Sequence, residues 1–247
     1  MSSTWLILGA SSAIARAFAR AAAADGSDIL LAGRDREDLE ASAADLRVRF
    51  GRRAESVDFD ALDRAGHAAT LQRAREFAGE GTLNIFLAFG TMPSQTEIDA
   101  DPSLIEGLID SNYTGAVEIL HRAAPVFEEQ RAGAIVVLTS VAGDRGRMKN
   151  YVYGSAKAAL GTYLQGLRAR LFRAGVSVVT VKPGPVDTAM SYGLNDLPLM
   201  AQPDAIAATC LKAAKKGTEV VYAPGLWWVI MTIIKLIPER IFKKLNI

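Results

Sequence analysis

The sequence predicts a single-domain α/β protein whose core is a doubly wound, parallel sheet of seven strands. Two observations lead to this prediction. Seven short apolar runs alternate with longer helical patterns, as they do when crossover helices join parallel strands. Half of the 247 residues are hydrophobic and 22% are charged, which suits one well-filled core. Right-handed crossovers then place helices on both faces of the sheet.

The elements follow one another along the chain without an internal repeat or a low-complexity linker. The predicted strands are residues 5–8, 29–32, 55–57, 85–88, 135–138, 176–181 and 220–222. The predicted helices are residues 12–24, 36–50, 62–79, 102–129, 150–174 and 203–216. The connection 184–202 lacks clear periodicity, and connections of that length are often mobile lids.

The first strand runs into the first helix through the turn Gly9-Ala-Ser-Ser-Ala-Ile-Ala15. Free N–H groups at the start of a helix and the helix dipole favour a pyrophosphate there. Four residues of this turn are candidate cofactor contacts: Gly9, Ser11, Ser12 and Ile14. Ala13 and Ala15 stand where such turns usually have glycines, and their methyl groups could crowd the phosphate or the helix-strand contact. Nucleotide binding and a tight strand-to-helix turn both remain open on this loop alone.

The turn after the second strand contains Gly33 and Arg34. An NAD-binding protein usually carries an acid at the position of Gly33, which holds the ribose 2′-hydroxyl. The guanidinium of Arg34 can instead pair with a 2′-phosphate, so the turn favours NADP(H) over NAD(H). A solvated arginine in a charged turn is the alternative interpretation.

The ends of the third and fourth strands supply further candidate cofactor contacts. Asp58 and Phe59 follow the third strand and fit a contact with the edge of the adenine. Ala88 and Gly90 lie at the end of the fourth strand, where Gly90 lets the backbone approach the cofactor.

Tyr153 and Lys157 lie on the predicted helix 150–174, and Ser140 follows the fifth strand. Residues four apart share one face of a helix, so the Lys157 ammonium can lie near the Tyr153 phenol and lower its pKa toward working pH. A phenol with its ordinary pKa near ~10 is a poor proton donor or acceptor at neutrality. The spacing therefore predicts carbonyl or alcohol chemistry through Tyr153.

Each of these residues also has a structural interpretation. A Tyr-x-x-x-Lys match is weak by itself in a chain with six tyrosines. Ser140 could cap a turn, and Asn112, on the predicted helix 102–129, could satisfy helix backbone. Tyr151 could be the functional phenol, although only Tyr153 has a lysine one turn further on.

The sixth strand is followed by the turn Pro183-Gly-Pro-Val-Asp-Thr188. Its prolines make it stiff, and it falls at the carboxyl ends of the strands, where such sheets bind ligands. Four residues are candidate cofactor contacts: Pro183, Gly184, Val186 and Thr188. Thr188 can hydrogen-bond the carboxamide of a nicotinamide.

Composition excludes several other classes of protein. Lys and Arg total 28 against 27 Asp and Glu, and the net charge of +1 indicates no nucleic-acid surface. The single cysteine, Cys210, excludes internal disulfides and a cysteine-rich metal site, and we expect a buried structural thiol. His67 and His121 lack a paired acid or a second ligand, so we expect structural roles and no metal site. The first apolar run reads as a strand and not as a secretion signal, which predicts a cytoplasmic protein.

The C-terminal segment 226–247 is far more apolar at its start than an exposed terminus requires, and it divides the chain into a domain of residues 1–225 and an extension. The apolar stretch is shorter than the ~18 to 20 residues that span a membrane, and Lys235 interrupts it. Trp227 and Trp228 with nearby basic residues could hold a helix at the inner, anionic lipid surface. Burial against the chain's own core or against a second subunit is the competing interpretation.

The combined motifs resemble those of the short-chain dehydrogenase/reductase family over essentially the whole chain. This resemblance implies a Rossmann fold with the strand order 3-2-1-4-5-6-7. It also implies a catalytic tetrad of Asn112, Ser140, Tyr153 and Lys157. It further implies hydride transfer from a nicotinamide to a ketone, with Tyr153 as the acid, Ser140 on the substrate oxygen, Lys157 also on the ribose hydroxyls and Asn112 ordering a water. A homodimer or homotetramer through the helices predicted at 102–129 and 150–174 is implied as well.

Several segments resemble a narrower group, the reductases of decaprenylphosphoryl-2-keto-ribose epimerisation. These segments are residues 57–63, 87–90, 112–116, 151–157 and 237–247. The resemblance implies a 2-keto pentose on a polyprenyl phosphate as substrate, made by a flavoprotein oxidase partner for a cell wall polysaccharide. The alanines in the glycine turn and the Gly33-Arg34 pair depart from what is expected there. A reductase of small ketones and a non-catalytic nucleotide-sensing or scaffold protein remain the alternatives.

Overall fold

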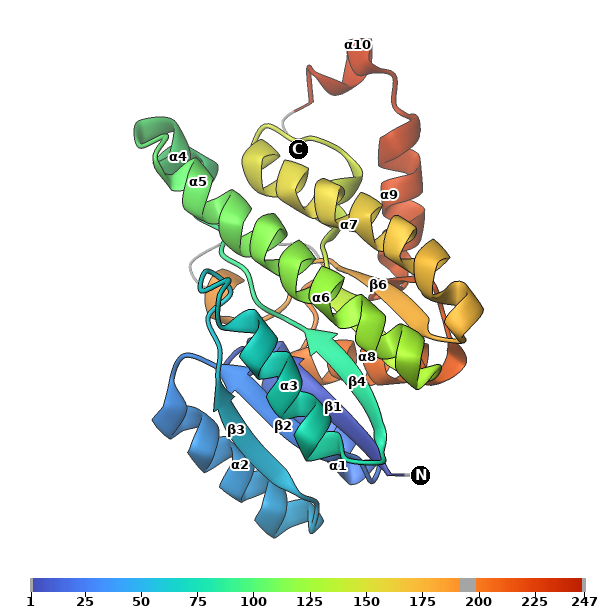
Figure 1. Cartoon of the computed structure of the whole chain (residues 1–247). Coiled ribbons are helices and arrows are strands. Elements are labelled where there is room, and N and C mark those ends of the chain that lie inside the picture. The colour runs from blue at the N-terminus through green and yellow to red at the C-terminus, as the bar shows by residue number, and fades with distance from the viewer. Residues whose placement is uncertain (1, 192–198, 246–247) are drawn as a thin grey trace.

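The computed structural model describes residues 2–191 and 199–245 and confirms the predicted sheet (Figure 1). All seven strands are present, pair in parallel and follow the order β3-β2-β1-β4-β5-β6-β7. The strands are β1 (Ser3–Leu8), β2 (Asp28–Gly33), β3 (Ala54–Asp58), β4 (Thr82–Leu87), β5 (Ala134–Leu138), β6 (Ser177–Pro183) and β7 (Val220–Ala223). The central strands are buried along their whole length, which explains why they read as continuous apolar runs.

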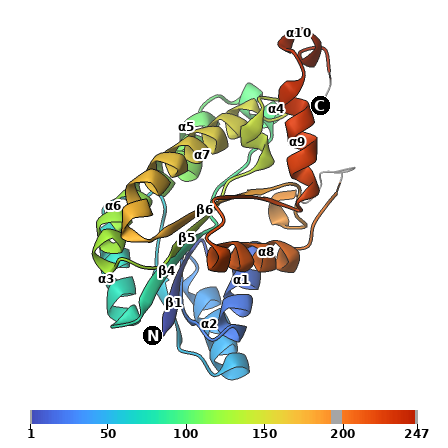
Figure 2. The same ribbon diagram turned by 90° about the vertical axis from the view of Figure 1, so that its right-hand side faces the viewer.

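Helices cover both faces of the sheet. The α-helices are α1 (Ala13–Ala24), α2 (Arg36–Phe50), α3 (His67–Ala78), α4 (Gln95–Ala100), α5 (Leu104–Ile109), α6 (Gly115–Gln130), α7 (Tyr151–Leu171), α8 (Pro203–Lys216), α9 (Leu226–Leu236) and α10 (Glu239–Phe242). Short 3-10 or π segments are η1 (Asp110–Thr114), η2 (Val141–Asp144), η3 (Phe172–Ala174) and η4 (Ala189–Ser191). Helices α1, α2 and α8 pack on one face and α3, α6 and α7 on the other (Figure 2). The two faces bury separate apolar cores, so the sheet is doubly wound in a single domain.

Local sequence explains where α1 begins and where α2 begins and ends. The Ser12 hydroxyl accepts a hydrogen bond from the Ala15 amide at 3.2 Å and caps α1. The Asp35 carboxylate caps α2 in the same way, accepting from the Asp38 amide at 3.1 Å. Helix α2 ends at Gly51 in the left-handed conformation, which glycine adopts without strain.

Two helical predictions differ from the structure. The single helix predicted at 102–129 is α5, the π-helical η1 and α6 in succession, and the preceding α4 was not predicted. Helix α4 has its own start signal, a reciprocal cap in which Ser94 and Glu97 bond each other's amides. The helix predicted at 62–79 begins only at His67, because Asp60 and Asp63 accept backbone N–H groups and stabilise turns before it.

The C-terminal extension packs against the loop that follows β5. Trp227 and Met231 of α9 are buried in a cluster with Val141. Arg145 donates to Glu239 of α10 at 2.6 Å and lies 4.3 Å above the Phe242 ring. One face of the extension is therefore buried on its own chain, as one of the two interpretations expected.

The opposite face of α9 is apolar and exposed. Leu226, Trp228, Val229, Ile233 and Leu236 are each at least two-fifths exposed. Within residues 2–191 and 199–245, no helix has both the length and the apolar character needed to cross a membrane.

The sequence predicted structural roles for Cys210, His67 and His121, and these three residues lie in different environments. Cys210 is fully buried on α8, and burial raises the pKa of its thiol to about 12, so the prediction of a buried thiol is confirmed. His67 is also fully buried and stacks on the Phe59 ring at 5.3 Å. His121 is exposed. The described part of the chain contains no cluster of three or more His, Cys, Asp or Glu residues that could hold a metal ion.

Candidate active site

A cavity of about 700 Å³ opens at the carboxyl ends of the strands. Its walls come from the turn before α1, the ends of β4, β5 and β6, the start of α7 and the first turn of α9. A cavity of this volume at this edge of a doubly wound sheet can hold a dinucleotide's nicotinamide end together with a small substrate.

The structure brings most of the candidate residues to this cavity. Those that line it are Ser11, Ser12, Ile14, Ala88, Gly90, Ser140, Tyr153, Lys157, Pro183, Gly184, Val186 and Thr188. Gly9, Arg34, Asp58, Phe59 and Asn112 do not line it. The connection predicted as a lid contributes Thr188 and the adjoining η4, whereas its residues 192–198 lie outside the described residues.

Ser140, Tyr153 and Lys157 lie together in the wall of the cavity. Tyr153 and Lys157 are only 7% and 5% exposed, one helical turn apart on α7. The Ser140 hydroxyl accepts a hydrogen bond from the Ala142 amide at 3.0 Å and lies near enough to the Tyr153 phenol to oppose the rise in its pKa. The Lys157 amine lies 5.7 Å from the centre of the Tyr153 ring and donates to the Leu138 carbonyl at 3.5 Å. The Ser140 hydroxyl and the Tyr153 phenol can therefore act on one substrate oxygen, with the Lys157 amine behind them.

The prediction that Lys157 lowers the pKa of the Tyr153 phenol is wrong. Burial raises the pKa of the Tyr153 phenol to about 12, and the nearby Ser140 hydroxyl only partly opposes this. The Lys157 amine, 5.7 Å from the centre of the ring, does not offset the effect of burial on the phenol. Burial also lowers the pKa of the Lys157 amine, to about 8. Tyr153 thus holds its proton at neutral pH, which is the state an acid needs when a ketone is reduced.

The lowered pKa of Lys157 leads to a prediction about folding stability. Between about pH 8 and its ordinary pKa of 10.5, the unfolded chain holds a proton that the folded chain has lost, so stability rises with pH in this window. We expect the difference in unfolding free energy between wild type and Lys157→Met to change in favour of wild type by about 1 kcal/mol per pH unit in this window. Urea unfolding without nucleotide measures it. Tyr153 is present in both chains, so its own titration contributes equally to both and cancels in the difference. If the two unfolding free energies changed with pH in parallel, the Lys157 amine would not be desolvated in the folded chain.

Asn112 lies on the π-helical η1, a segment type that often occurs at functional sites. Its amide nitrogen donates to the Thr91 and Leu108 carbonyls at 2.7 and 3.0 Å, which fixes the side chain. Its Oδ1 is buried and has no partner among residues 2–191 and 199–245. Gly90 lies directly against this oxygen, and a β-carbon on Gly90 would overlap it and come within 3.4 Å of the Lys157 amine. The free oxygen can therefore accept a hydrogen bond from a water beside Lys157.

The turn before α1 fits a nucleotide despite its alanines. Gly9 has φ +80°, and an added β-carbon would lie 2.7 Å from that of Phe89, so only glycine fits there. Ala15 is fully buried in the core, so the contact between helix and sheet accommodates its methyl group. Ala13 lies at the cavity wall, where the first turn of α1 presents free N–H groups. These donors suit the pyrophosphate of a dinucleotide.

The residues predicted for the adenosine end lie outside the cavity. Arg34 is exposed in the turn after β2, next to Arg36, whose guanidinium lies 3.8 Å from the Asp58 carboxylate. The Phe59 ring points into the core between His67 and Phe89, and its backbone N–H donates to the Gly33 carbonyl at 2.9 Å, so neither group is free to contact an adenine. Sequence spacing indicated the position of Phe59 but not the direction of its side chain.

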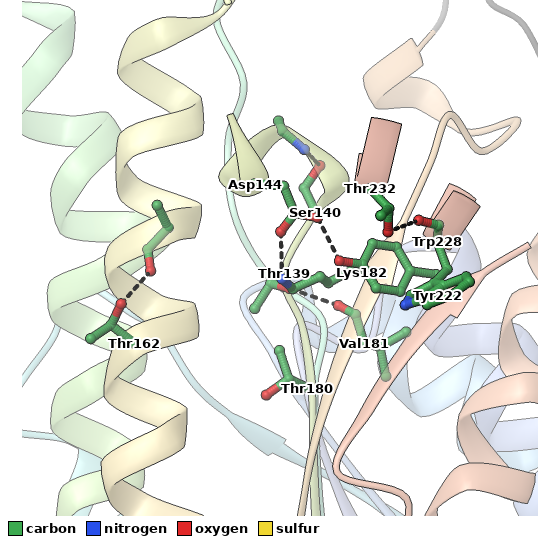
Figure 3. A network of polar contacts seen from close by, with 12 residues as sticks. Thr139, Ser140, Asp144, Thr162, Thr180, Val181, Lys182, Tyr222, Trp228 and Thr232 are labelled. Atoms are coloured by element: carbon green, nitrogen blue, oxygen red, sulfur yellow. Dashed lines mark hydrogen bonds and ion pairs between the residues drawn. The ribbon is translucent and has the colours of Figure 1, made fainter. Parts of the chain in front are cut away.

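Four polar residues near the cavity were not predicted from the sequence. Arg147, Asn150 and Trp227 line it, and their only sequence signal is that two of them precede Tyr153 and one opens the apolar extension. Trp227 lies against Gly184, where an added β-carbon would overlap the indole. Asp144 ends η2, and its buried carboxylate pairs with Lys182 and accepts from the Tyr222 hydroxyl at 2.6 Å (Figure 3). This network ties the loop that carries Ser140 to β6 and β7.

Comparisons with known proteins show similarity over most of the chain. The family model described as short chain dehydrogenase matches residues 3–197. An uncharacterized oxidoreductase of Streptomyces coelicolor is 35% identical over 97% of this chain and 94% of its own length. The uncharacterized oxidoreductase Rv2073c of Mycobacterium tuberculosis is 32% identical over 97% and 96%. A short-chain dehydrogenase from Sphingobium yanoikuyae, solved in complex with NADPH, superposes with a TM-score of 0.79 at 27% identity, covering 97% of both chains.

Proposed function

Because this chain belongs to the short-chain dehydrogenase family, we propose that it is an NADP(H)-dependent oxidoreductase that reduces a ketone to a secondary alcohol. The observation that carries this proposal is the convergence of Ser140, Tyr153 and Lys157 on one buried cavity. The complete set disfavours the non-catalytic alternative, since a nucleotide sensor needs no buried phenol beside a lysine.

The geometry supports a division of roles among these residues. A bound nicotinamide cofactor supplies the hydride. Tyr153, protonated at neutral pH, donates its proton to the substrate oxygen as negative charge develops there. Ser140 donates a hydrogen bond to the same oxygen. Lys157, whose lowered pKa lies near neutrality, returns a proton toward Tyr153, and the free Oδ1 of Asn112 orders the water that links Lys157 to solvent.

We further propose that the substrate is the 2-keto sugar of a polyprenylphosphoryl pentose, supplied by a flavoprotein oxidase. This rests on the resemblance of residues 57–63, 112–116 and 237–247 to the reductases of that epimerisation. Turnover of the polyprenylphosphoryl 2-keto pentose, measured against simple ketones with NADPH and with NADH, tests it. Preference for the lipid-linked sugar is expected. Equal turnover of simple ketones would favour the generic reductase, and NADPH binding without any turnover would favour the sensor.

The NADP preference is assigned to Arg34. We expect Arg34→Ala to weaken NADPH binding about tenfold, because a charge-assisted pair with the 2′-phosphate is lost, and to leave NADH binding unchanged. Titration by nucleotide fluorescence measures both. Arg49→Ala, which removes an exposed arginine of α2 paired with Asp45, is the control and should change neither. An equal loss for NADPH and NADH would rule out recognition of the 2′-phosphate by Arg34.

A homodimer or homotetramer through α6 and α7 is also proposed. Phe172, directly after α7, is 77% exposed, as expected for an apolar side chain near a subunit contact. Light scattering coupled to gel filtration measures the mass in solution. A mass of one chain would dismiss this assembly.

We propose that the protein is cytoplasmic and that α9 and α10 contact the inner, anionic face of a membrane. The exposed apolar face of α9 is accompanied by the exposed basic residues Lys235, Arg240, Lys243 and Lys244. We expect wild type to float with vesicles that contain phosphatidylglycerol, and Trp228→Glu with Ile233→Glu to lose flotation, because charges then face the acyl chains. Val48→Glu, at an 86% exposed apolar residue of α2, is the control. Equal flotation of all three would dismiss membrane contact through α9.

A further inference from the structure

The cavity contains buried polar groups that the proposed reaction does not use. Arg147 and Asn150 both line it, on the segment between η2 and α7 that leads into Tyr153. The Nε of Arg147 and the Oδ1 of Asn150 are buried and have no hydrogen-bond partner within residues 2–191 and 199–245. Buried polar groups are nearly always satisfied in a working state, and each unsatisfied one is costly. Two such groups at one wall point to a polar ligand.

The charge of Arg147 is not balanced by the protein. The acid closest to it in sequence, Asp144, has one carboxylate oxygen on Lys182 and the other on the Tyr222 hydroxyl. In the described part of the chain, no carboxylate forms an ion pair with Arg147. Burial lowers the pKa of its guanidinium, and Asp144 opposes this shift. A half-buried guanidinium without a counterion favours an anion that enters the cavity.

The second arginine at the cavity shows the contrast. Arg16 lines the end near α1, and its guanidinium pairs with Asp38 and donates to the Ser42 hydroxyl at 2.7 Å. Its charge is therefore used within the protein. Arg147 instead lies on the segment between Ser140 and Tyr153, which is the end of the cavity where the ketone reacts.

We propose that Arg147 and Asn150 form a subsite for an anionic, hydroxylated ketone substrate. Arg147 pairs with a phosphate or carboxylate of the substrate, for which its planar, two-pronged donor group is suited. The free Oδ1 of Asn150 accepts a hydrogen bond from a neighbouring substrate hydroxyl. This inference rests on the proposed ketone reduction, which defines the end of the cavity where the substrate reacts. The substrate class itself is tested by binding, without turnover.

Binding of non-reacting anions tests the subsite without catalysis. The enzyme is loaded with NADPH, so that the cofactor's own phosphate sites are filled and an alcohol has no hydride acceptor, and glycerol 3-phosphate, lactate and glycerol are titrated by calorimetry. We expect one or both anions to bind at least about tenfold more tightly than glycerol, and the tighter one identifies phosphate or carboxylate. Arg147→Gln should remove this preference. Lys149→Gln, the same charge change at an exposed residue two positions away that does not line the cavity, should keep it.

Other outcomes overturn the proposal. Equal affinity of wild type for the anions and glycerol would show that no anion subsite exists. Full preference retained in Arg147→Gln would place it elsewhere. If Arg147→Gln does not bind NADPH, it has not folded correctly, and Arg147→Lys replaces it in the titration. Lysine keeps the positive charge but lacks the two-pronged donor geometry. A partial loss of preference supports the subsite, and full preference overturns recognition by the planar guanidinium.

A turnover ratio separates failure of the subsite from failure of the proposed function. The ratio of kcat/KM for dihydroxyacetone phosphate to that for dihydroxyacetone cancels any general loss of hydride transfer. We expect Arg147→Gln to lower it about tenfold or more relative to Lys149→Gln. An unchanged ratio would overturn the role of Arg147 while leaving ketone reduction intact. If neither ketone is reduced, the turnover assay fails for both and the calorimetric titration alone judges the subsite.

Discussion

Replacing Tyr153 with phenylalanine should reduce kcat for ketone reduction by about 10²- to 10⁴-fold, which is the range that general acid catalysis contributes. The cavity wall keeps its shape, because phenylalanine differs from tyrosine only by the hydroxyl. Affinity for NADPH should therefore remain within about twofold, as measured by nucleotide fluorescence. The physical reason is that Tyr153 carries its proton at neutral pH in a buried site where water does not replace it.

Tyr151 supplies a matched control for this experiment. It lies two residues earlier on α7, is half exposed, and donates to Asp99 at 3.0 Å. Tyr151→Phe should leave kcat nearly unchanged, which would dismiss the alternative that Tyr151 is the functional phenol. If Tyr153→Phe instead keeps full turnover, Tyr153 is not the acid, and the convergence of Ser140 and Lys157 on it has another purpose.

Replacing Asp144 with asparagine should destabilise the fold by about 2 kcal/mol, because the change leaves Lys182 without its carboxylate while keeping the shape of the side chain. The value is below that for a fully buried pair, since the Asp144 side chain is 3% exposed but that of Lys182 is 21% exposed. In a chain of 247 residues, this corresponds to a fall of about 4 to 8 °C in Tm. Thermal unfolding followed by circular dichroism measures it.

The same substitution should also reduce turnover, because Asp144 fastens the loop that carries Ser140 to β6 and β7 (Figure 3). Asp25→Asn is the matched control, because it breaks the exposed pair with Lys215 and should change Tm little. A Tm of Asp144→Asn equal to that of Asp25→Asn would show that the network around Asp144 does not stabilise the loop.

Much of the fold was predictable because its causes are local. Strands buried on both faces appear as continuous apolar runs, so all seven were found. Ser140 was placed by its position after β5, and Tyr153 and Lys157 were placed by their spacing on one helix. Helix α5–η1–α6 was predicted as one regular helix, since the fixing of Asn112 by the Thr91 carbonyl depends on a residue 21 positions away.

The sequence by itself determined the parallel sheet of seven strands and most of the residues that meet at its carboxyl edge, because hydrophobic periodicity and parallel connections follow from neighbouring residues. Only the tertiary structure determined the electrostatics of the site. Burial raises the pKa of Tyr153 and lowers that of Lys157, the opposite of what their spacing suggested for the phenol. Among residues 2–191 and 199–245 it also left Arg147 without an ion-pair partner, because Asp144 is occupied by residues of β6 and β7. Desolvation and charge pairing depend on which elements, distant in the sequence, pack around a group. Periodicity and residue spacing along the chain do not show that packing.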